Sequence, residues 1–180
     1  MKTKSMIICG IFAAVICVLS VITVPIGPVP ITLGLLGIML AGVILGWKRG
    51  AVAVLVFVLL GAVGLPVFSG FKGGISVLLG PTGGYIWSYV IVTLIIGALS
   101  AKDYKNKWLT MLRIFLACLL GTAVCYALGT VQFMAVTKSD FVKAMSLCVL
   151  PFIPFDILKA VVAAFAGHEI RAALMKAKLL

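Results

Sequence analysis

The sequence predicts an all-α integral membrane protein, a bundle of six transmembrane helices with both termini in the cytoplasm. Three observations support this: the apolar composition, the spacing of the apolar runs and the placement of the basic residues. Of the 180 residues, 64% are hydrophobic and 11% are charged. Soluble domains average about 45–50% apolar and about 25% charged residues. The composition therefore excludes a water-soluble fold, and with it the nucleic-acid binding that a net charge of +11 suggests in a soluble protein.

Apolar runs alternate with residues that interrupt helices. A spanning helix needs about 20 mostly apolar residues, so the chain has room for about six spans and no separate soluble domain. The predicted spans lie near 6–24, 31–46, 50–65, 84–100, 108–128 and 146–167. The second and third are short. The whole chain, 1–180, is expected to form a single membrane domain.

Basic residues separate onto two sides of the predicted bundle. An even number of spans leaves both termini on one side, which then holds eleven of the 15 Lys and Arg residues: Lys2, Lys4, Lys48, Arg49, Lys102, Lys105, Lys107, Arg113, Arg171, Lys176 and Lys178. The other side holds Lys72, Lys138 and Lys143, and Lys159 lies within the last span. Because short cytoplasmic loops carry an excess of Lys and Arg, both termini are predicted to be cytoplasmic.

Prolines gather on the opposite, outer side. The outer loops and the outer end of the last span contain all seven: Pro25, Pro28, Pro30, Pro66, Pro81, Pro151 and Pro154. Non-helical backbone is tolerated at membrane depth only where protein or a water-filled cavity satisfies its hydrogen bonds. We therefore expect a folded outer cap over a pocket, with the glycine-rich segment 66–83 as its lid.

The strongest indication of a binding site is a pair of charges within the last span. Asp156 and Lys159 are the only ionisable residues well inside a predicted span, and residues three apart lie on one helix face. Intramembrane charges are costly and usually face a ligand or ion path. The pair is therefore either a polar anchor for a small ligand, which the neighbouring Pro154 favours, or a structural ion pair that holds the helix to its neighbours.

Two outer segments offer further polar groups. Thr82 is suited to cap the fourth span, and Gly83 and Gly84 allow close backbone approach at a helix N-terminus, which attracts anions. The alternative is a plain turn and cap. Thr32, which follows two prolines, either caps the second span or offers its hydroxyl to a ligand. Aromatic residues near the outer interface are typical of an aromatic belt, and one or two could line the pocket: Phe68, Phe71, Tyr85, Trp87 and Tyr89.

The first span carries small residues four apart. Gly10 and Ala14, and likewise Ala13 and Cys17, allow close helix contact, either within the bundle or in docking onto another membrane protein. The sequence contains no Walker motif and no clear Ser/His/Asp arrangement, and its five cysteines show no metal-ligand spacing. We expect no enzymatic activity, no metal and no cofactor.

Five segments, taken together, resemble the BioY family. They are VPIGPVPIT at 24–32, the turn at 42–50, GAVGLPVF at 61–68, LGPTGGY at 79–85 and FIPFDILKA at 152–160. The resemblance runs in the same order from about residue 20 to residue 165. BioY proteins are biotin-specific substrate-binding subunits of energy-coupling-factor (ECF) transporters of prokaryotic cell membranes. The resemblance implies a six-helix bundle that opens outward, with a transmembrane coupling subunit and two cytoplasmic ATPases as partners, and toppling in the membrane as the delivery step.

The resemblance also assigns roles to the residues above. Asp156 is expected to accept a ureido N–H of biotin, and Lys159 to donate to the ureido oxygen or to the carboxylate. The remaining polar contacts are expected from Thr32, the backbone of Thr82, Gly83 and Gly84, and Tyr85. The family's docking motif in the first span is Ala-x-x-x-Ala. The matching positions here read Gly10-x-x-x-Ala14 or Ala13-x-x-x-Cys17.

The sequence also permits other functions. An autonomous secondary transporter would use Asp156 as a proton carrier. A structural membrane scaffold would have the Asp156–Lys159 pair and no open pocket. Within the leading interpretation, another vitamin such as thiamine or riboflavin is an alternative ligand.

Overall fold

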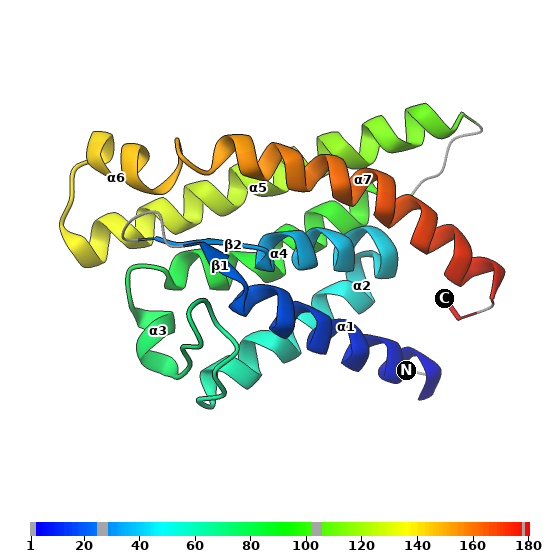
Figure 1. Cartoon of the computed structure of the whole chain (residues 1–180), viewed down its shortest axis with the longest axis horizontal. Coiled ribbons are helices and arrows are strands. Elements are labelled where there is room, and N and C mark those ends of the chain that lie inside the picture. The colour runs from blue at the N-terminus through cyan, green and yellow to red at the C-terminus, as the bar shows by residue number, and fades with distance from the viewer. Residues whose placement is uncertain (1–2, 25–28, 102–105, 178) are drawn as a thin grey trace.

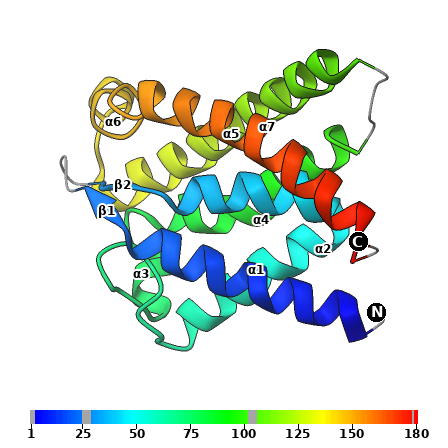
Figure 2. The same cartoon turned by 45° about the vertical axis from the view of Figure 1, so that its right-hand side comes forward.

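The computed structural model describes residues 3–24, 29–101, 106–177 and 179–180, and most of these residues are helical. In chain order the elements are α1 (Thr3–Val21), β1 (Thr23–Val24), β2 (Ile31–Thr32), α2 (Gly34–Ala62), α3 (Ile75–Leu79), α4 (Gly83–Leu99), α5 (Lys107–Thr137), α6 (Phe141–Cys148) and α7 (Ile153–Lys176) (Figure 1). The two strands pair antiparallel. Figures 1 and 2 place both termini at one end of the bundle, the terminal end, and α3, α6 and the strands at the other, the cap end.

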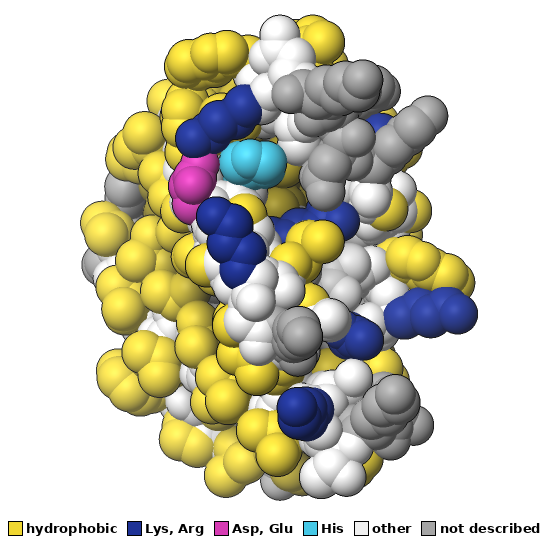
Figure 3. Space-filling view, turned by 90° about the vertical axis from the view of Figure 1, so that its right-hand side faces the viewer, with side chains coloured by type: hydrophobic (Ala, Val, Ile, Leu, Met, Phe, Trp, Pro, Cys, Tyr) yellow, Lys and Arg dark blue, Asp and Glu magenta, His cyan; other side chains and the backbone are white. Residues whose placement is uncertain are grey.

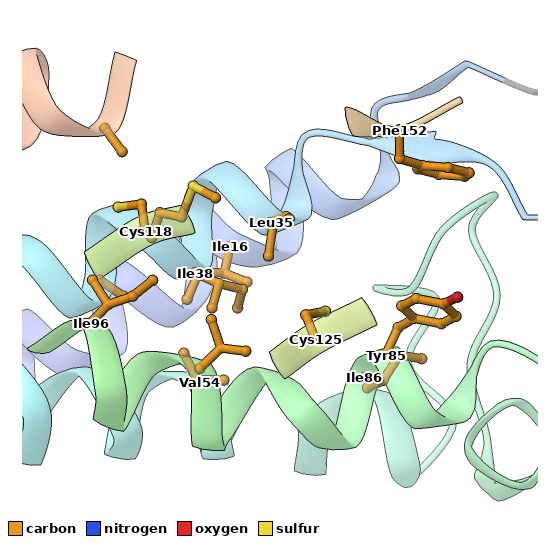
Figure 4. Close-up of a cluster of buried hydrophobic side chains, with 14 of the residues drawn as sticks. Ile16, Leu35, Ile38, Val54, Tyr85, Ile86, Ile96, Cys118, Cys125 and Phe152 are labelled. Atoms are coloured by element: carbon orange, nitrogen blue, oxygen red, sulfur yellow. The ribbon is translucent and has the colours of Figure 1, made fainter. Parts of the chain in front are cut away.

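The core lies where α2 meets its neighbours. α2 packs against α1, α4 and α7, and α5 packs against α4 and α7. Ile16, Ile38, Val54 and Ile96 come from three of these helices and are fully buried together (Figure 4). Large apolar side chains also cover the outside, including Met6 and Val18, each 61% exposed. Such a surface suits lipid rather than water, since soluble monomers rarely expose extended apolar patches.

α2 is folded back on itself at Gly46, which has φ 75° and ψ −179° between two helical arms. A Cβ atom at Gly50 would lie 2.8 Å from the carbonyl oxygen of Ala41. In a continuous helix these two residues would be about 13 Å apart along the axis. The chain therefore reverses direction within α2 (Figure 1). The two arms correspond to the second and third predicted spans, separated by a shorter break than predicted.

Length and composition give fewer spans than the sequence pattern predicts. α1, α2 and α5 are each long and apolar enough to cross a membrane, and α6 with α7 qualifies as one span bent by 50°. For the described residues this gives three or four spans, against the predicted six. The difference arises because α2 counts once although it has two arms, and because α4, with 17 residues, is shorter than the typical span of about 20.

Two predicted boundaries differ in the structure. The segment 129–145 was expected to be a loop, but α5 continues to Thr137 and α6 follows. Gly129 does not break the helix; a Cβ atom there would lie 2.3 Å from the ring of Tyr85, so this glycine makes room for an aromatic side chain. The last predicted span is interrupted between α6 and α7 by a turn that contains Pro151. Proline has no backbone N–H to donate, and its ring clashes with the preceding helical turn, so α6 does not continue through this residue.

Phe68 attaches the lid (66–83) to the second arm of α2. Its side chain is 2% exposed, and it meets the ring of Phe57 edge-on at a centroid distance of 5.6 Å. A Cβ atom at Gly61 would lie 2.0 Å from the Phe68 ring, so only glycine at this position leaves space for that ring. The backbone N–H of Gly74 also donates to the carbonyl of Gly61 at 2.7 Å.

α3, within the lid, is attached to α5 and α4 through its C-terminal carbonyl groups. Gln132 Nε2 donates to the carbonyl oxygens of Leu78 at 2.8 Å and Gly80 at 2.9 Å. Trp87 Nε1 donates to the Leu78 oxygen at 3.3 Å. The last carbonyls of a helix have no partner within the helix, so these side chains satisfy groups that would otherwise lack a hydrogen bond.

Replacing Gly97 should destabilise the α2 turn. A Cβ atom at this position of α4 would lie 2.3 Å from the backbone nitrogen of Trp47, which cannot move without shifting the turn. We expect Gly97→Ala to cost about 1–3 kcal/mol, as overpacking does, and to lower the midpoint of thermal unfolding in detergent. Gly10→Ala is the control, because a Cβ atom there meets nothing within 4 Å. Equal midpoints for the two variants would contradict the close approach.

Removing the Gln132 amide should loosen α3. Gln132→Met keeps the side-chain length and loses both hydrogen bonds, worth about 0.5–1.5 kcal/mol each. We expect faster hydrogen exchange at the backbone amides of 75–80 in the ligand-free protein, measured by mass spectrometry. Thr137→Val, at the end of the same helix, is the control, since that hydroxyl bonds to Phe133 O and Ser139 Oγ near the end of α5. Unchanged exchange in Gln132→Met would contradict a role for the two Gln132 hydrogen bonds in holding α3.

Candidate ligand-binding site

A cavity of about 130 Å³ lies beneath the lid. It is bounded by α1, β2, both arms of α2, the lid, α4, α5 and the first turns of α7. A single water needs about 10–15 Å³ on a comparable measure, so the space suits a small organic molecule. Its walls are mainly apolar, with Leu35, Phe57, Phe68, Ile86 and Phe152 among them. Apolar walls with a few convergent polar groups are typical of small-molecule sites.

Asp156 and Lys159 both line this cavity from α7. Asp156 is 4% exposed and Lys159 is 7% exposed, and Lys159 Nζ donates to Asp156 Oδ1 at 2.7 Å. Tyr126 Oη, from α5, donates to Asp156 Oδ2 at 2.6 Å. Asp156 also lies in the first turn of its helix, where a negative charge is stabilised by the helix dipole. The carboxylate is therefore held in one orientation by two donors.

This arrangement leaves hydrogen-bonding capacity for a ligand. A carboxylate has about four acceptor positions and an ammonium group has three donors. One bond from Lys159 and one from Tyr126 use half of the capacity of Asp156, and Lys159 uses one of its three N–H groups. The ion pair joins two residues of the same helix, so it does not itself hold α7 to a neighbour; Tyr126 makes that connection.

Thr32, Thr82 and Tyr85 also line the cavity. The hydroxyl of Thr32 accepts from the backbone N–H of Gly34 at 3.0 Å. Thr82 occupies the N-cap position of α4, as expected, but its side chain makes no capping bond. Tyr85 is buried, and its hydroxyl donates to the carbonyl of Cys148 at 3.4 Å.

Gly83 and Gly84 do not line the cavity. A Cβ atom at Gly83 would lie 1.8 Å from the carbonyl oxygen of Leu78, and one at Gly84 would lie 2.7 Å from that of Leu128. Both glycines allow the start of α4 to pack against α3 and α5. In this structure they position Thr82 and Tyr85 at the cavity wall.

Several lining residues lie outside the candidates that the sequence pattern selects. Tyr126, Ser20, Ser69 and Lys72 come from α5, α1 and the lid. Tyr126 could have been selected from the sequence, because it is a polar aromatic residue in the middle of an apolar helix. The two serines could not, because a single serine in an apolar run is common where helices pack closely. Among the described residues, no group of three His, Cys, Asp or Glu is placed to hold a metal ion.

The small residues of α1 divide between two faces. Gly10 and Ala14 are exposed on the outside of the bundle. Ala13 is 2% exposed and packs inward, and Cys17 is partly buried. Of the two possible docking pairs, Gly10 and Ala14 are therefore accessible to another protein.

Comparison with known proteins extends these observations. The sequence profile of the BioY family matches residues 1–176. A protein of Thermotoga maritima described as biotin transporter BioY is 43% identical over 169 residues, covering 93% of this chain and 96% of the relative. A protein of Rhizobium etli with the same description is 38% identical over 177 residues, covering 94% of each chain.

A solved structure has the same fold. The crystal structure of the S-component for biotin from an ECF-type ABC transporter superposes with a TM-score of 0.82 at 29% sequence identity. The match covers 95% of this chain and 92% of that one. The sequence resemblance is thereby confirmed along nearly the whole length of the chain, which belongs to the BioY family.

Proposed function

We propose that this protein binds biotin in the cavity beneath the lid and serves as the substrate-specific subunit of an ECF-type ABC transporter. The observation that carries the proposal is the trio formed by the buried Asp156 and Lys159 with the partly buried Tyr126, which faces a cavity of suitable size in a member of the BioY family. The choice of biotin as the ligand rests on the relatives described as biotin transporters and on the solved S-component for biotin.

The chemistry of biotin complements this trio. The ureido ring presents two N–H donors and one carbonyl acceptor. Asp156 is an acceptor with unused positions, and Lys159 is a donor with unused N–H groups, so together they match both kinds of group on one ring. The apolar thiophane ring and aliphatic chain would contact Phe57, Phe68 and Ile86.

The charge distribution supports a membrane arrangement with six crossings and cytoplasmic termini. Both arms of α2 then count as spans, as do α1, α4, α5 and α7. Lys and Arg side chains are spread over the terminal end of the bundle (Figure 3). Lys48 and Arg49 lie at the α2 turn, and Arg171 donates to the carbonyl of Ser100 at the end of α4. Excess Lys and Arg marks the cytoplasmic side.

The partners follow from the same assignment. An S-component would assemble in the prokaryotic cell membrane with a transmembrane coupling subunit and two cytoplasmic ATPases. The exposed Gly10 and Ala14 on α1 offer a surface for close helix contact with the coupling subunit. The match to the solved S-component for biotin favours this assignment over the secondary-transporter alternative.

Asp156→Asn should weaken biotin binding strongly. The substitution removes the charged acceptor and leaves Lys159 buried without its counter-ion. Hydrogen bonds to charged groups contribute about 1.5–3 kcal/mol, which corresponds to a roughly tenfold to hundredfold increase in Kd. Isothermal titration of biotin-depleted protein measures this, with Lys159→Ala as the partner variant. Asp140→Asn, an exposed carboxylate at the start of α6, is the control. Wild-type affinity in Asp156→Asn would remove Asp156 from the binding site.

Tyr126→Phe should have a smaller effect. It removes one hydrogen bond to Asp156 and keeps the ring, so we expect a loss of about 0.5–1.5 kcal/mol of binding energy, or roughly twofold to tenfold in Kd. The same titration measures the change. A double variant with Asp156→Asn should bind no more weakly than Asp156→Asn alone, because Tyr126 acts through that carboxylate. Additive losses would instead place Tyr126 in direct contact with biotin.

A further inference from the structure

Two hydroxyl groups at the cavity have no hydrogen-bond partner among the described residues. Ser20 Oγ, from α1, and Ser69 Oγ, from the lid, are both buried, and both residues line the cavity. Ser20 is 4% exposed. Buried polar groups in folded proteins are nearly always hydrogen-bonded, and each unsatisfied one costs about 1–3 kcal/mol. A binding site explains such a cost, because a ligand can supply the missing partner.

The surroundings of Ser20 decide which kind of partner fits. A Cβ atom at Gly34 would lie 2.6 Å from Ser20 Oγ and 3.0 Å from Thr32 Oγ1, so both hydroxyls lie beside this glycine. Thr32 Oγ1 already accepts from the N–H of Gly34 at 3.0 Å, which leaves its own hydrogen for donation. α1, β2 and the first residue of α2 therefore bring two hydroxyl donors together.

The local charge favours an anion at the same place. α2 begins at Gly34, and Leu35, its second residue, lines the cavity. A helix N-terminus carries a partial positive charge, and here the N–H groups of Gly34 and Gly37 already have partners. Lys72, an exposed residue of the lid, also lines the cavity and carries a full positive charge. Hydroxyl donors beside a positive helix end suit an acceptor with negative charge, such as a carboxylate.

We propose that Ser20, Thr32 and the start of α2 form a second subsite, which binds the carboxylate of the ligand, with the Ser69 hydroxyl contributed by the lid. This inference rests on the proposed function, because biotin carries one carboxylate at the end of its aliphatic chain. The subsite fixes the orientation of the ligand. The N–H donors of the ureido ring meet Asp156, an acceptor, and the carboxylate meets the hydroxyl donors.

The test compares stability and affinity in the same variants. Ser20→Ala and Ser69→Ala remove hydroxyls that have no hydrogen-bond partner in the described part of the chain, so the thermal midpoint of the ligand-free protein should stay the same or rise. Biotin affinity should fall by roughly threefold to tenfold in each, as expected for the loss of one hydrogen bond. Ser100→Ala is the control: its hydroxyl is also buried without a partner among the described residues, but Ser100 ends α4 away from the cavity. It should leave the affinity unchanged.

A biotin analogue with a methyl group in place of the carboxyl group identifies the contacted part. Ser20→Ala should bind this analogue as well as the wild-type protein does. An equal loss of affinity for biotin and for the analogue would move Ser20 to another part of the ligand and overturn the carboxylate subsite. Full biotin affinity in Ser20→Ala and Ser69→Ala would also overturn it, while leaving the proposed function intact. A wild-type protein that does not bind biotin would overturn both.

Discussion

The buried ion pair between Asp156 and Lys159 is stable only if the surrounding helices supply further hydrogen bonds to it. Removing a charge from water costs several kcal/mol per ion in a protein interior, and pairing repays this only with good geometry and further hydrogen bonds. The pair is joined at 2.7 Å, and Tyr126 adds a bond to the second carboxylate oxygen. Because Tyr126 belongs to α5, the polar anchor needs α5 and α7 side by side. Pro151 lies in the turn between α6 and α7, and Pro154 lies in the first turn of α7, so that Asp156 falls in that turn as well.

Close backbone contacts bring the remaining walls of the cavity into place. Gly46 allows α2 to reverse direction, and Gly97 lets α4 pack directly on that turn. At the other end of α4, Gly83 allows the helix to begin against the carbonyl groups of α3. α4 therefore contacts the α2 turn at one end and the lid at the other, and Tyr85 projects from it into the cavity between them. Without side chains at these glycines, the helices approach closely enough to enclose a small ligand.

The sequence predicted the parts of this structure that depend on composition and on local spacing. Apolar runs located the helices, and the cost of intramembrane charge identified Asp156 and Lys159. What could not be predicted depends on which segments become neighbours. Gly129 resembles a helix end in the sequence, yet it lies inside α5 because the Tyr85 ring occupies the space beside it. Gly83 and Gly84 resemble an anion-binding turn, but Leu78 and Leu128 contact them instead. Ser20 could not be identified from the sequence, because only its position beside Gly34 in the folded protein distinguishes it from a serine that merely packs between helices.

The lid differs from the rest of the bundle in what holds it closed. The helices meet through many fully buried apolar side chains, whereas the lid buries two, Phe68 and Leu78, each 2% exposed. Its other large apolar side chains include Phe71, Ile75 and Leu79, which are exposed. Hydrogen bonds from Gln132 and Trp87 to carbonyl groups of the lid add to these contacts. Segments with few buried apolar contacts open at a lower free energy than the core does. We therefore expect the lid to separate more readily than the helices around the Asp156–Lys159 pair. Opening there would leave that pair intact, so affinity at the polar anchor and access through the lid would depend mainly on different residues.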